Sequence, residues 1–511
     1  MGLISPKIMF TAFLKKRFGL FMLDSGSRFL LKLIASACNV YVTGVLIAVL
    51  GKDQFGVYRS ASASVGFLSL ASAGVAGASF GLVVRYLTRG EYSSVNAIVT
   101  RALKHLWIAG GVLLVLSIPS GYALAYAYNI SPAMRESFVY AAALSSAAMA
   151  LGFFSAPFIW IIQAQQREYV LNFLHIPLAI IAPILMIMLS KWHPMGWSPC
   201  LASGVISVIG CILCIVTSIW MYRSWLRWSS IKTSDDVGKR TGYSLLEQLG
   251  GIVLAQAVIW SATFHTGVAS VAQLVVTMTF FSFTKDFLQT LASTLVTPVG
   301  SLFHGGQRER AAEAWYDASV WIVALSVSVA VILVAMNSRI IASWVGASNF
   351  ADQSVNILVA LSFILVAANV VSVQVIYAVD GYSERARLML LEGVLTAALG
   401  FTLGSIYGLS GTLIGACIAQ IISLILYPMM IMRRLEINFK GFYLILLRIV
   451  LIAILPLSAL QCVLPHLHFT KSFIGTIVQA GIFGIITLVI VIIGGVTSET
   501  RMRLFNRLKI V

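Results

Sequence analysis

Long apolar runs dominate the chain from residue 29 to residue 495. Most are about 20 residues long, the length that a helix needs to cross the hydrocarbon core of a bilayer. Helices and closed barrels alone satisfy their backbone hydrogen bonds in lipid, and barrel strands would alternate in short segments, so runs of this length predict helices. Fourteen spans are expected, at 29–50, 60–84, 106–128, 138–162, 169–190, 200–221, 243–264, 268–303, 318–336, 355–379, 387–407, 411–432, 443–463 and 473–495.

The composition supports an all-α integral membrane protein. Of 511 residues, 59% are hydrophobic and 10% are charged, whereas soluble domains have about half apolar and a quarter charged residues. The apolar stretch from Ile8 to Leu23 is interrupted by Lys15, Lys16 and Arg17 and lacks a cleavage site for a signal peptidase. Residues 1–27 are therefore predicted to form an amphipathic segment on the cytoplasmic surface.

Basic residues are distributed unevenly between the two sides of the membrane. With the N-terminus inside, cytoplasmic segments hold 26 of the 35 Lys and Arg residues and the opposite side holds 6. This imbalance predicts that both termini are cytoplasmic, and it explains the net charge of +17 as a topology signal. No soluble domain remains to carry a basic groove, so no nucleic-acid partner is expected.

Two sequence echoes indicate an internal repeat. Leu-x-x-Gly follows the second span at Leu87 and the eighth span at Leu302, and Gly196-Trp-Ser-Pro has a counterpart in Gly408-Leu-Ser-Gly. Because six spans separate the copies, both would enter the membrane from the cytoplasm as a parallel repeat. The expected organisation is an N-terminal lobe at 28–221, a cytoplasmic linker at 222–242, a C-terminal lobe at 243–432, a helix pair at 443–495 and a cytoplasmic tail at 496–511.

Three segments resemble the multidrug/oligosaccharidyl-lipid/polysaccharide (MOP) exporter superfamily, and within it the Wzx-type flippases of lipid-linked oligosaccharides. They are LGKDQFGVYRSASASVGFLSLASAGV between the first two spans, the P-x(3)-L-x-x-G pattern at 298–305, and GLSGTLIGACIAQIISL at 408–424. The resemblance implies two lobes that rock around a central cavity and reside in the bacterial inner membrane. It also implies an undecaprenyl-pyrophosphate-linked glycan of O-antigen or other surface polysaccharide as substrate, other membrane lipid in contact with the protein, and polymerase or chain-length machinery as partners. Many Wzx-type members have twelve spans, whereas fourteen is similar to the lipid II flippase branch.

Cations outnumber carboxylates in and at the ends of the spans, which fits an anionic substrate group. Arginine suits a diphosphate because its planar fork donates two hydrogen bonds and keeps its charge when desolvated. A charge within the bilayer usually faces a cavity or the bundle interior. The predicted substrate-binding cations are Arg28, Lys32, Arg59, Arg85 and Lys285. The alternatives are interfacial anchoring for Arg59 and Arg85, and a structural ion pair for Lys285.

Proton or sodium coupling would require a carboxylate within the spans. The candidates are Asp286, Glu247 and Glu392, although a carboxylate at a helix end is more often structural. Asp286 follows Lys285 at about 100° around a helix, so the two side chains cannot point at the same spot.

Three other functions are weighed against a flippase. A multidrug and toxin extrusion exporter would draw organic cations to carboxylates. A membrane polymerase or glycosyltransferase would need catalytic residues in its outer loops. A channel would show a filter motif. No P-loop and no HExxH motif occurs, and no enzyme activity and no cofactor are expected. Cys211 and Cys214 form a C-x-x-C within an apolar run, where packing is a better explanation than a metal site.

Overall fold

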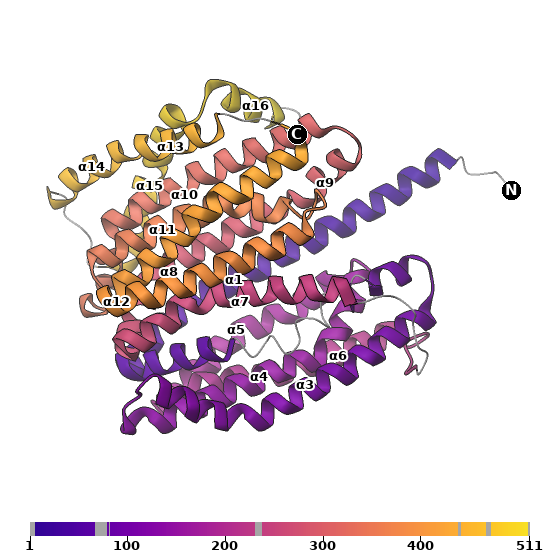
Figure 1. The fold of residues 1–511 in the computed structure, drawn as a ribbon, viewed down its shortest axis with the longest axis horizontal. Coiled ribbons are helices and arrows are strands. Elements are labelled where there is room, and N and C mark those ends of the chain that lie inside the picture. The colour runs from indigo at the N-terminus through magenta and orange to yellow at the C-terminus, as the bar shows by residue number, and fades with distance from the viewer. Residues whose placement is uncertain are drawn as a thin grey trace. The chain divides into compact units, whose positions relative to one another are not determined.

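The computed structural model describes residues 6–66, 79–80, 82–229, 238–437, 441–466 and 472–508. Those ranges consist of helices joined by short turns and loops, with no strand among them (Figure 1). Twelve helices among the described residues are long and apolar enough to span a membrane. The predicted all-α integral membrane fold is confirmed, and the chain is a multi-pass membrane protein. The helices are α1 (Pro6–Val65), α3 (Tyr92–Ala127), α4 (Pro132–Ala164), α5 (Glu168–Trp192), α6 (Ser198–Tyr222), α7 (Gly238–Thr266), α8 (Val268–Ser293), α9 (Val296–His304), α10 (Arg308–Trp344), α11 (Gln353–Val375), α12 (Tyr382–Leu435), α13 (Phe442–Ile452), α14 (Ile454–Val463), α15 (Phe473–Gly495) and α16 (Ser498–Leu508).

Two pairs of predicted spans are joined by a sharp turn at a glycine rather than by a loop. Gly408, with φ of 58°, breaks α12 between the predicted spans 387–407 and 411–432, so both lie within one element. Gly51, with φ of 71°, likewise separates the two halves of α1, and the second half begins well before the predicted residue 60. Glycine has no Cβ and adopts positive φ without steric cost. Much of the predicted second span, residues 67–78 and 81, lies outside the described residues.

One predicted span is interrupted by a proline. The run 443–463 forms two short helices, α13 and α14, which are separated at Ala453. Pro456 follows within the first turn of α14. A proline there lacks the N–H that would continue the hydrogen-bonding of the preceding helix, and its ring clashes with the carbonyl four residues earlier.

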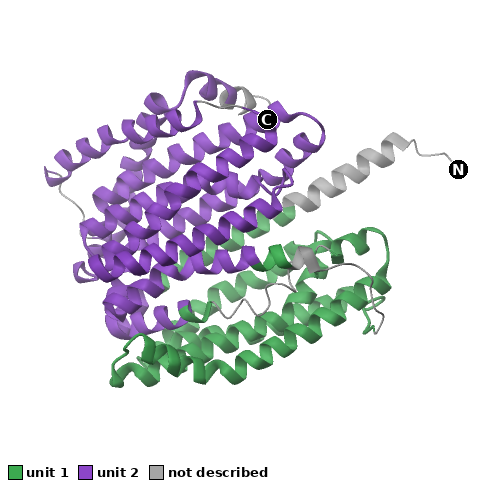
Figure 2. Ribbon diagram, viewed as in Figure 1, with its two compact units in different colours: residues 1–42, 64–245 green, residues 43–63, 246–511 purple. Residues whose placement is uncertain are grey.

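The chain divides into two compact units (Figure 2). Residues 1–42 and 64–245 form the first unit, and residues 43–63 and 246–511 form the second. In the first unit, α4 packs against both α3 and α6, and α5 packs against α6. The predicted lobe boundaries at 28–221 and 243–432 stay a prediction.

The second unit is built around α10. This helix contacts α8, α11, α13 and α15. In its most apolar stretch of 18 residues, 72% of the residues are buried. Trp315 of α10 is fully buried and stacks on Phe442 of α13, with ring centroids 4.8 Å apart. The C-terminal helices are therefore packed onto the second unit rather than loosely attached to it.

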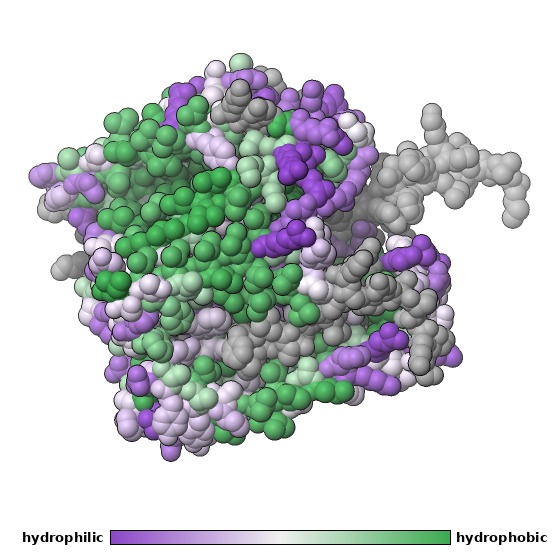
Figure 3. Space-filling model, viewed as in Figure 1, coloured by the Kyte–Doolittle hydropathy of each residue, from purple (hydrophilic) through white to green (hydrophobic). Residues whose placement is uncertain are grey.

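The surface of the second unit is largely apolar on the face shown in Figure 3. Large apolar side chains of the C-terminal helices stay exposed, including Leu444 on α13, Leu455 on α14 and Ile474 on α15. Such extensive apolar exposure is unusual for a soluble monomer. It is the surface that contact with lipid tails requires.

Candidate functional site

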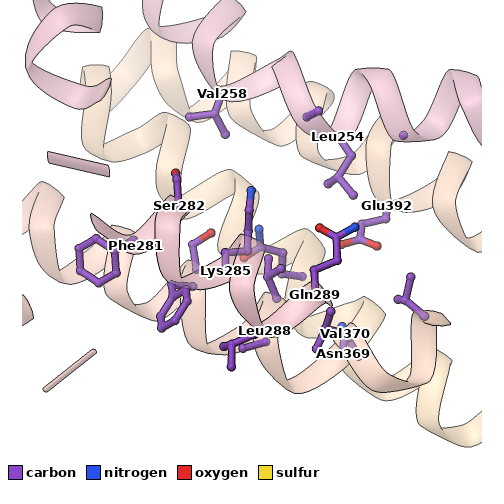
Figure 4. A pocket seen from close by; sticks show the side chains of 18 of the residues that line it. Leu254, Val258, Phe281, Ser282, Lys285, Leu288, Gln289, Asn369, Val370 and Glu392 are labelled. Atoms are coloured by element: carbon purple, nitrogen blue, oxygen red, sulfur yellow. The ribbon is translucent and has the colours of Figure 1, made fainter. Parts of the chain in front are cut away.

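The second unit contains a cavity of about 350 Å³ lined by residues of α7, α8, α11 and α12 (Figure 4). The α8 lining residues include Met278, Phe281, Ser282, Lys285 and Gln289. Their spacing of three and four residues places them on one face of the helix. The remaining wall is mostly apolar, and apolar walls with few polar groups are typical of small-molecule sites.

Lys285 lines this cavity together with a predicted coupling residue, Glu392. Lys285 is the one cation and Glu392 the one carboxylate among the described lining residues. The other polar residues of the wall are four amides, Gln289, Asn369, Gln374 and Gln420, and three hydroxyl-bearing residues, Ser282, Ser362 and Tyr427. In Figure 4, Lys285 and Glu392 lie on opposite sides of Gln289, and both side chains lie below Leu254 and Val258 of α7.

Glu392 is buried, with 7% of its surface exposed. Its carboxylate accepts a hydrogen bond from the Ser423 hydroxyl. Among the described residues it forms no ion pair within 4.0 Å. A buried carboxylate is costly unless it is neutralised or well hydrogen-bonded, so Glu392 is suited to take a proton or a donor-bearing ligand.

Asp286 does not line the cavity, although it is adjacent to Lys285 in sequence. The separation of about 100° between neighbouring helical positions accounts for this difference. Its backbone carbonyl accepts a hydrogen bond from Thr290 Oγ1 at 2.9 Å. Of the two charges in the stretch, the structure brings Lys285 into the cavity and leaves Asp286 half-buried beside it.

The third predicted carboxylate, Glu247 on α7, belongs to a partly buried polar cluster at one end of α12. Its Oε1 accepts hydrogen bonds from Arg385 Nε at 2.9 Å and from the Tyr377 hydroxyl. The Arg385 guanidinium also donates to the Val373 carbonyl and lies 4.1 Å from the centre of the Tyr377 ring. These contacts give Glu247 a structural role that sequence reasoning left open.

The other predicted cations do not line this cavity. Arg28 and Lys32 lie one turn apart on α1 in the first unit, and Arg28 forms an ion pair with Glu168 of α5. Nearby, Asp24 Oδ1 accepts the Tyr169 amide at 2.7 Å. The N-terminal part of α1 is therefore tied to the start of α5, which adds an anchoring role for Arg28 to the predicted substrate role.

Arg59 and Arg85 lie near helix ends, close to tyrosines. The Arg59 guanidinium carbon is 5.8 Å from the Tyr58 ring centre, and that of Arg85 is 5.9 Å from the Tyr86 ring centre. Arg59 belongs to the second unit and Arg85 to the first. Their predicted substrate role stays a prediction.

Sequence reasoning missed the cavity amides and Arg385. Asn369 and Gln420 are isolated amides within otherwise apolar runs, a signal that marks an intramembrane polar site. Arg385 lies at the start of α12, where its charge counts equally well as a topology signal. Only its position beside Glu247 reveals the ion pair.

A cysteine and a histidine meet in the first unit. Cys214 Sγ lies 3.6 Å from His175 Nε2, between α6 and α5. No group of three or more His, Cys, Asp or Glu side chains able to hold a metal occurs within the described part of the chain. The predicted packing role of Cys211 and Cys214 is consistent with their burial.

Comparison with solved structures identifies the fold. No family model matches the sequence, and no curated protein matches it. A lipid II flippase, MurJ, in an inward closed conformation is 15% identical, with a TM-score of 0.68 over 92% of this chain and 98% of the other. An inward-facing multidrug resistance MATE transporter of the MOP superfamily is 13% identical, with a TM-score of 0.61 over 81% of this chain and 98% of its own. A third structure is that of a MOP superfamily transporter from Pyrococcus furiosus, described by the reverse polarity of its binding pocket. It is 13% identical with a TM-score of 0.55, and the match covers 82% of this chain and 98% of the transporter.

These likenesses show that the chain has the MOP transporter fold, as the sequence resemblance implied. At 13% to 15% identity they carry the fold alone. The Wzx-type subfamily and the substrate are not fixed by them.

Proposed function

We propose that the protein is a flippase that moves a polyprenyl-pyrophosphate-linked oligosaccharide from the cytoplasmic to the periplasmic leaflet by alternating access. The observation that carries this proposal is the extent of the likeness to a lipid II flippase. The match to the lipid II flippase covers 92% of this chain, whereas the matches to three MATE transporters cover 81% to 83% of it. The additional coverage fits a chain that carries the helices α13 to α15 after α12.

The cavity chemistry supports an anionic substrate group. Lys285 provides an ammonium in a mostly apolar wall, and a hydrogen bond from a charged donor to an anionic group is about twice as strong as one between neutral groups. A MATE-type exporter of organic cations would be opposed by the same ammonium. The exposed apolar faces of α13 to α15 supply a surface for an isoprenoid tail.

Proton coupling belongs to the proposal as a role of Glu392, because the Lys285 ammonium in the same cavity disfavours a sodium ion. Glu247 is occupied by Arg385 and Tyr377, and Asp286 does not line the cavity. Glu392, buried in the cavity wall, is the predicted coupling carboxylate that the geometry favours. The proposed location is a bacterial inner membrane with both termini cytoplasmic, and the proposed partners are the machinery that polymerises the transported glycan.

The test is a flipping assay with the purified protein in liposomes. Fluorescent polyprenyl-pyrophosphate glycans of defined structure are inserted, and their accessibility to an external quencher or glycosidase is followed with time. We expect protein-dependent movement of the lipid-linked glycan and none of an organic dye cation. Accumulation of the dye without glycan movement would support a MATE-type exporter instead.

A further inference from the structure

The cavity of the second unit contains acceptor oxygens that the protein itself does not satisfy. Asn369 Oδ1 and Gln420 Oε1 are buried and have no hydrogen-bond partner among the described residues. The two side chains are 4% and 6% exposed, and both line the cavity. A buried acceptor without a donor is unfavourable and rare in native structures, so these oxygens indicate a ligand that brings donors.

The polar groups of the cavity are divided between its walls. Lys285 on α8 supplies a positively charged donor. Asn369 on α11 and Glu392 and Gln420 on α12 supply acceptors. Figure 4 shows Lys285, Gln289 and Glu392 in succession along the cavity. A ligand that matches this arrangement has an anionic group at one end and hydroxyl or amide donors at the other.

Simpler ligands match only part of the site. A metal cation would be repelled by the Lys285 ammonium in the same cavity, and an inorganic anion would leave the acceptors on α11 and α12 unsatisfied. Phe281, Phe363 and Tyr427 add aromatic surface to the wall, against which the apolar face of a sugar ring can pack. The volume of about 350 Å³ is near the lower end of small-molecule sites, about 300 to 1,000 Å³, and suits one sugar with its phosphate rather than a whole oligosaccharide.

We propose that this cavity is a sugar-phosphate subsite, in which Lys285 binds the phosphate and Asn369, Glu392 and Gln420 accept hydrogen bonds from the sugar. The inference rests on the proposed function in taking the sugar phosphate to be the membrane-proximal part of a lipid-linked glycan. A soluble sugar phosphate has the same chemistry, and the experiment separates the two sources. Glu392 as a sugar acceptor and Lys285 as a phosphate ligand explain why both charges lie in one cavity.

The experiment measures binding to the purified full-length protein in detergent by isothermal titration calorimetry. The probes are N-acetylglucosamine 1-phosphate, free N-acetylglucosamine, inorganic phosphate, and farnesyl pyrophosphate with and without the attached sugar. We expect the sugar phosphate to bind more tightly than either of its halves. If the lipid-linked form is the natural ligand, the farnesyl-linked sugar binds more tightly still, whereas equal affinity of the soluble compound indicates a soluble ligand.

Variants assign the two halves of the site. Lys285→Met should weaken sugar-phosphate binding about tenfold to a hundredfold and leave free-sugar binding unchanged, because only the ionic contact is lost. Gln420→Leu and Glu392→Gln should weaken the sugar and the sugar phosphate by a similar factor. Lys191→Met on α5 and Glu309→Gln on α10 are matched controls at exposed positions outside the cavity. Melting temperatures exclude misfolding, and the isosteric Glu392→Gln keeps the cavity filled.

Two results would overturn the subsite. One is sugar-phosphate binding that is indifferent to Lys285→Met and Gln420→Leu. The other is a rise in melting temperature with sodium chloride that choline chloride does not produce and that the Glu392→Gln variant does not show. That result would make the cavity a cation site. If the wild type flips lipid-linked glycan and cavity variants bind and flip normally, the subsite fails and the proposed function stands. If the cavity binds sugar phosphate but no lipid-linked glycan is flipped, the proposed function fails instead.

Discussion

Lys285 lies within a long apolar run of the sequence and lines the cavity of the second unit. The contribution of its charge can be tested separately from that of its packing. Lys285→Ala should abolish or severely reduce flipping at normal protein abundance, because the anionic group loses its charged hydrogen-bond donor in the cavity. Lys285→Arg should be milder, since the charge survives although its geometry changes. Transport is measured in the liposome assay. Near wild-type transport by Lys285→Ala at equal abundance would remove this residue from the substrate site.

The Glu247–Arg385 ion pair gives a prediction about stability. The two side chains are 14% and 10% exposed, so Glu247→Gln leaves Arg385 without its counter-charge in a buried position. We expect a loss of about 3 to 5 kcal/mol in the free energy of unfolding, measured by denaturant titration in detergent. The double variant Glu247→Gln, Arg385→Met should recover part of that loss. A coupling role would show the opposite pattern, with transport abolished and stability unchanged in Glu247→Gln.

At the scale of elements, α7 and α12 approach each other closely beside the cavity. A Cβ on Gly250 would lie 2.4 Å from the Leu390 amide nitrogen, and one on Gly393 would lie 2.6 Å from the Gly250 carbonyl oxygen. Both obstacles are backbone atoms, which cannot rotate away as a side chain can. This crossing therefore sets the separation between two helices that line the cavity. It lies next to three residues of the cavity wall, Gly251, Met389 and Glu392.

Gly250→Ala should force α7 and α12 apart and destabilise the protein by about 1 to 3 kcal/mol, the range for an overpacked core. Gly111→Ala on α3 is the matched control, because a Cβ there meets nothing within 4 Å. The control should be neutral or slightly stabilising, since alanine favours a helix by about 1 kcal/mol over glycine. Equal melting temperatures for the two variants would contradict the close crossing.

The C-terminal helices also give a prediction at this scale. Trp315 packs on Phe442, and Arg503 of α16 forms an ion pair with the buried Asp317 of α10 at 3.0 Å. Deletion after Asn438, a residue outside the described ranges, should leave an inserted protein that does not flip its substrate. Insertion is followed by alkali resistance of the membrane-bound protein. Full transport by the truncated protein would show that these helices form no groove for the lipid tail.

For the whole molecule, the distribution of basic residues predicts the orientation. The 222–242 link and both termini should be cytoplasmic. In a cysteine-free background, Ser234→Cys should resist a membrane-impermeant maleimide in intact cells, whereas His193→Cys, exposed between α5 and α6, should react. Ser234 itself lies outside the described residues. Ready labelling at position 234 would reverse the orientation.

The sequence by itself determined the class of fold, because span length and the apolar requirement of lipid are local properties that each run shows independently. It also singled out Lys285, since a charge within an apolar run is conspicuous without any structure. It placed the turn at Gly408 correctly, between the spans 387–407 and 411–432. It started the second span at residue 60, whereas the second half of α1 begins directly after Gly51, because a single residue with positive φ can reverse a chain.

Only the tertiary structure decided which charges act together. Glu247 and Arg385 are separated by 138 residues, and their ion pair depends on the packing of α7 against α12. Lys285 and Glu392 likewise share a cavity through the assembly of four helices, whereas the sequence neighbour Asp286 is turned away. Pairing between distant side chains follows from helix packing, and helix packing is set by contacts such as Gly250 against Leu390. A single sequence shows no such contact, because the shape of each helix surface acquires meaning only against its partner.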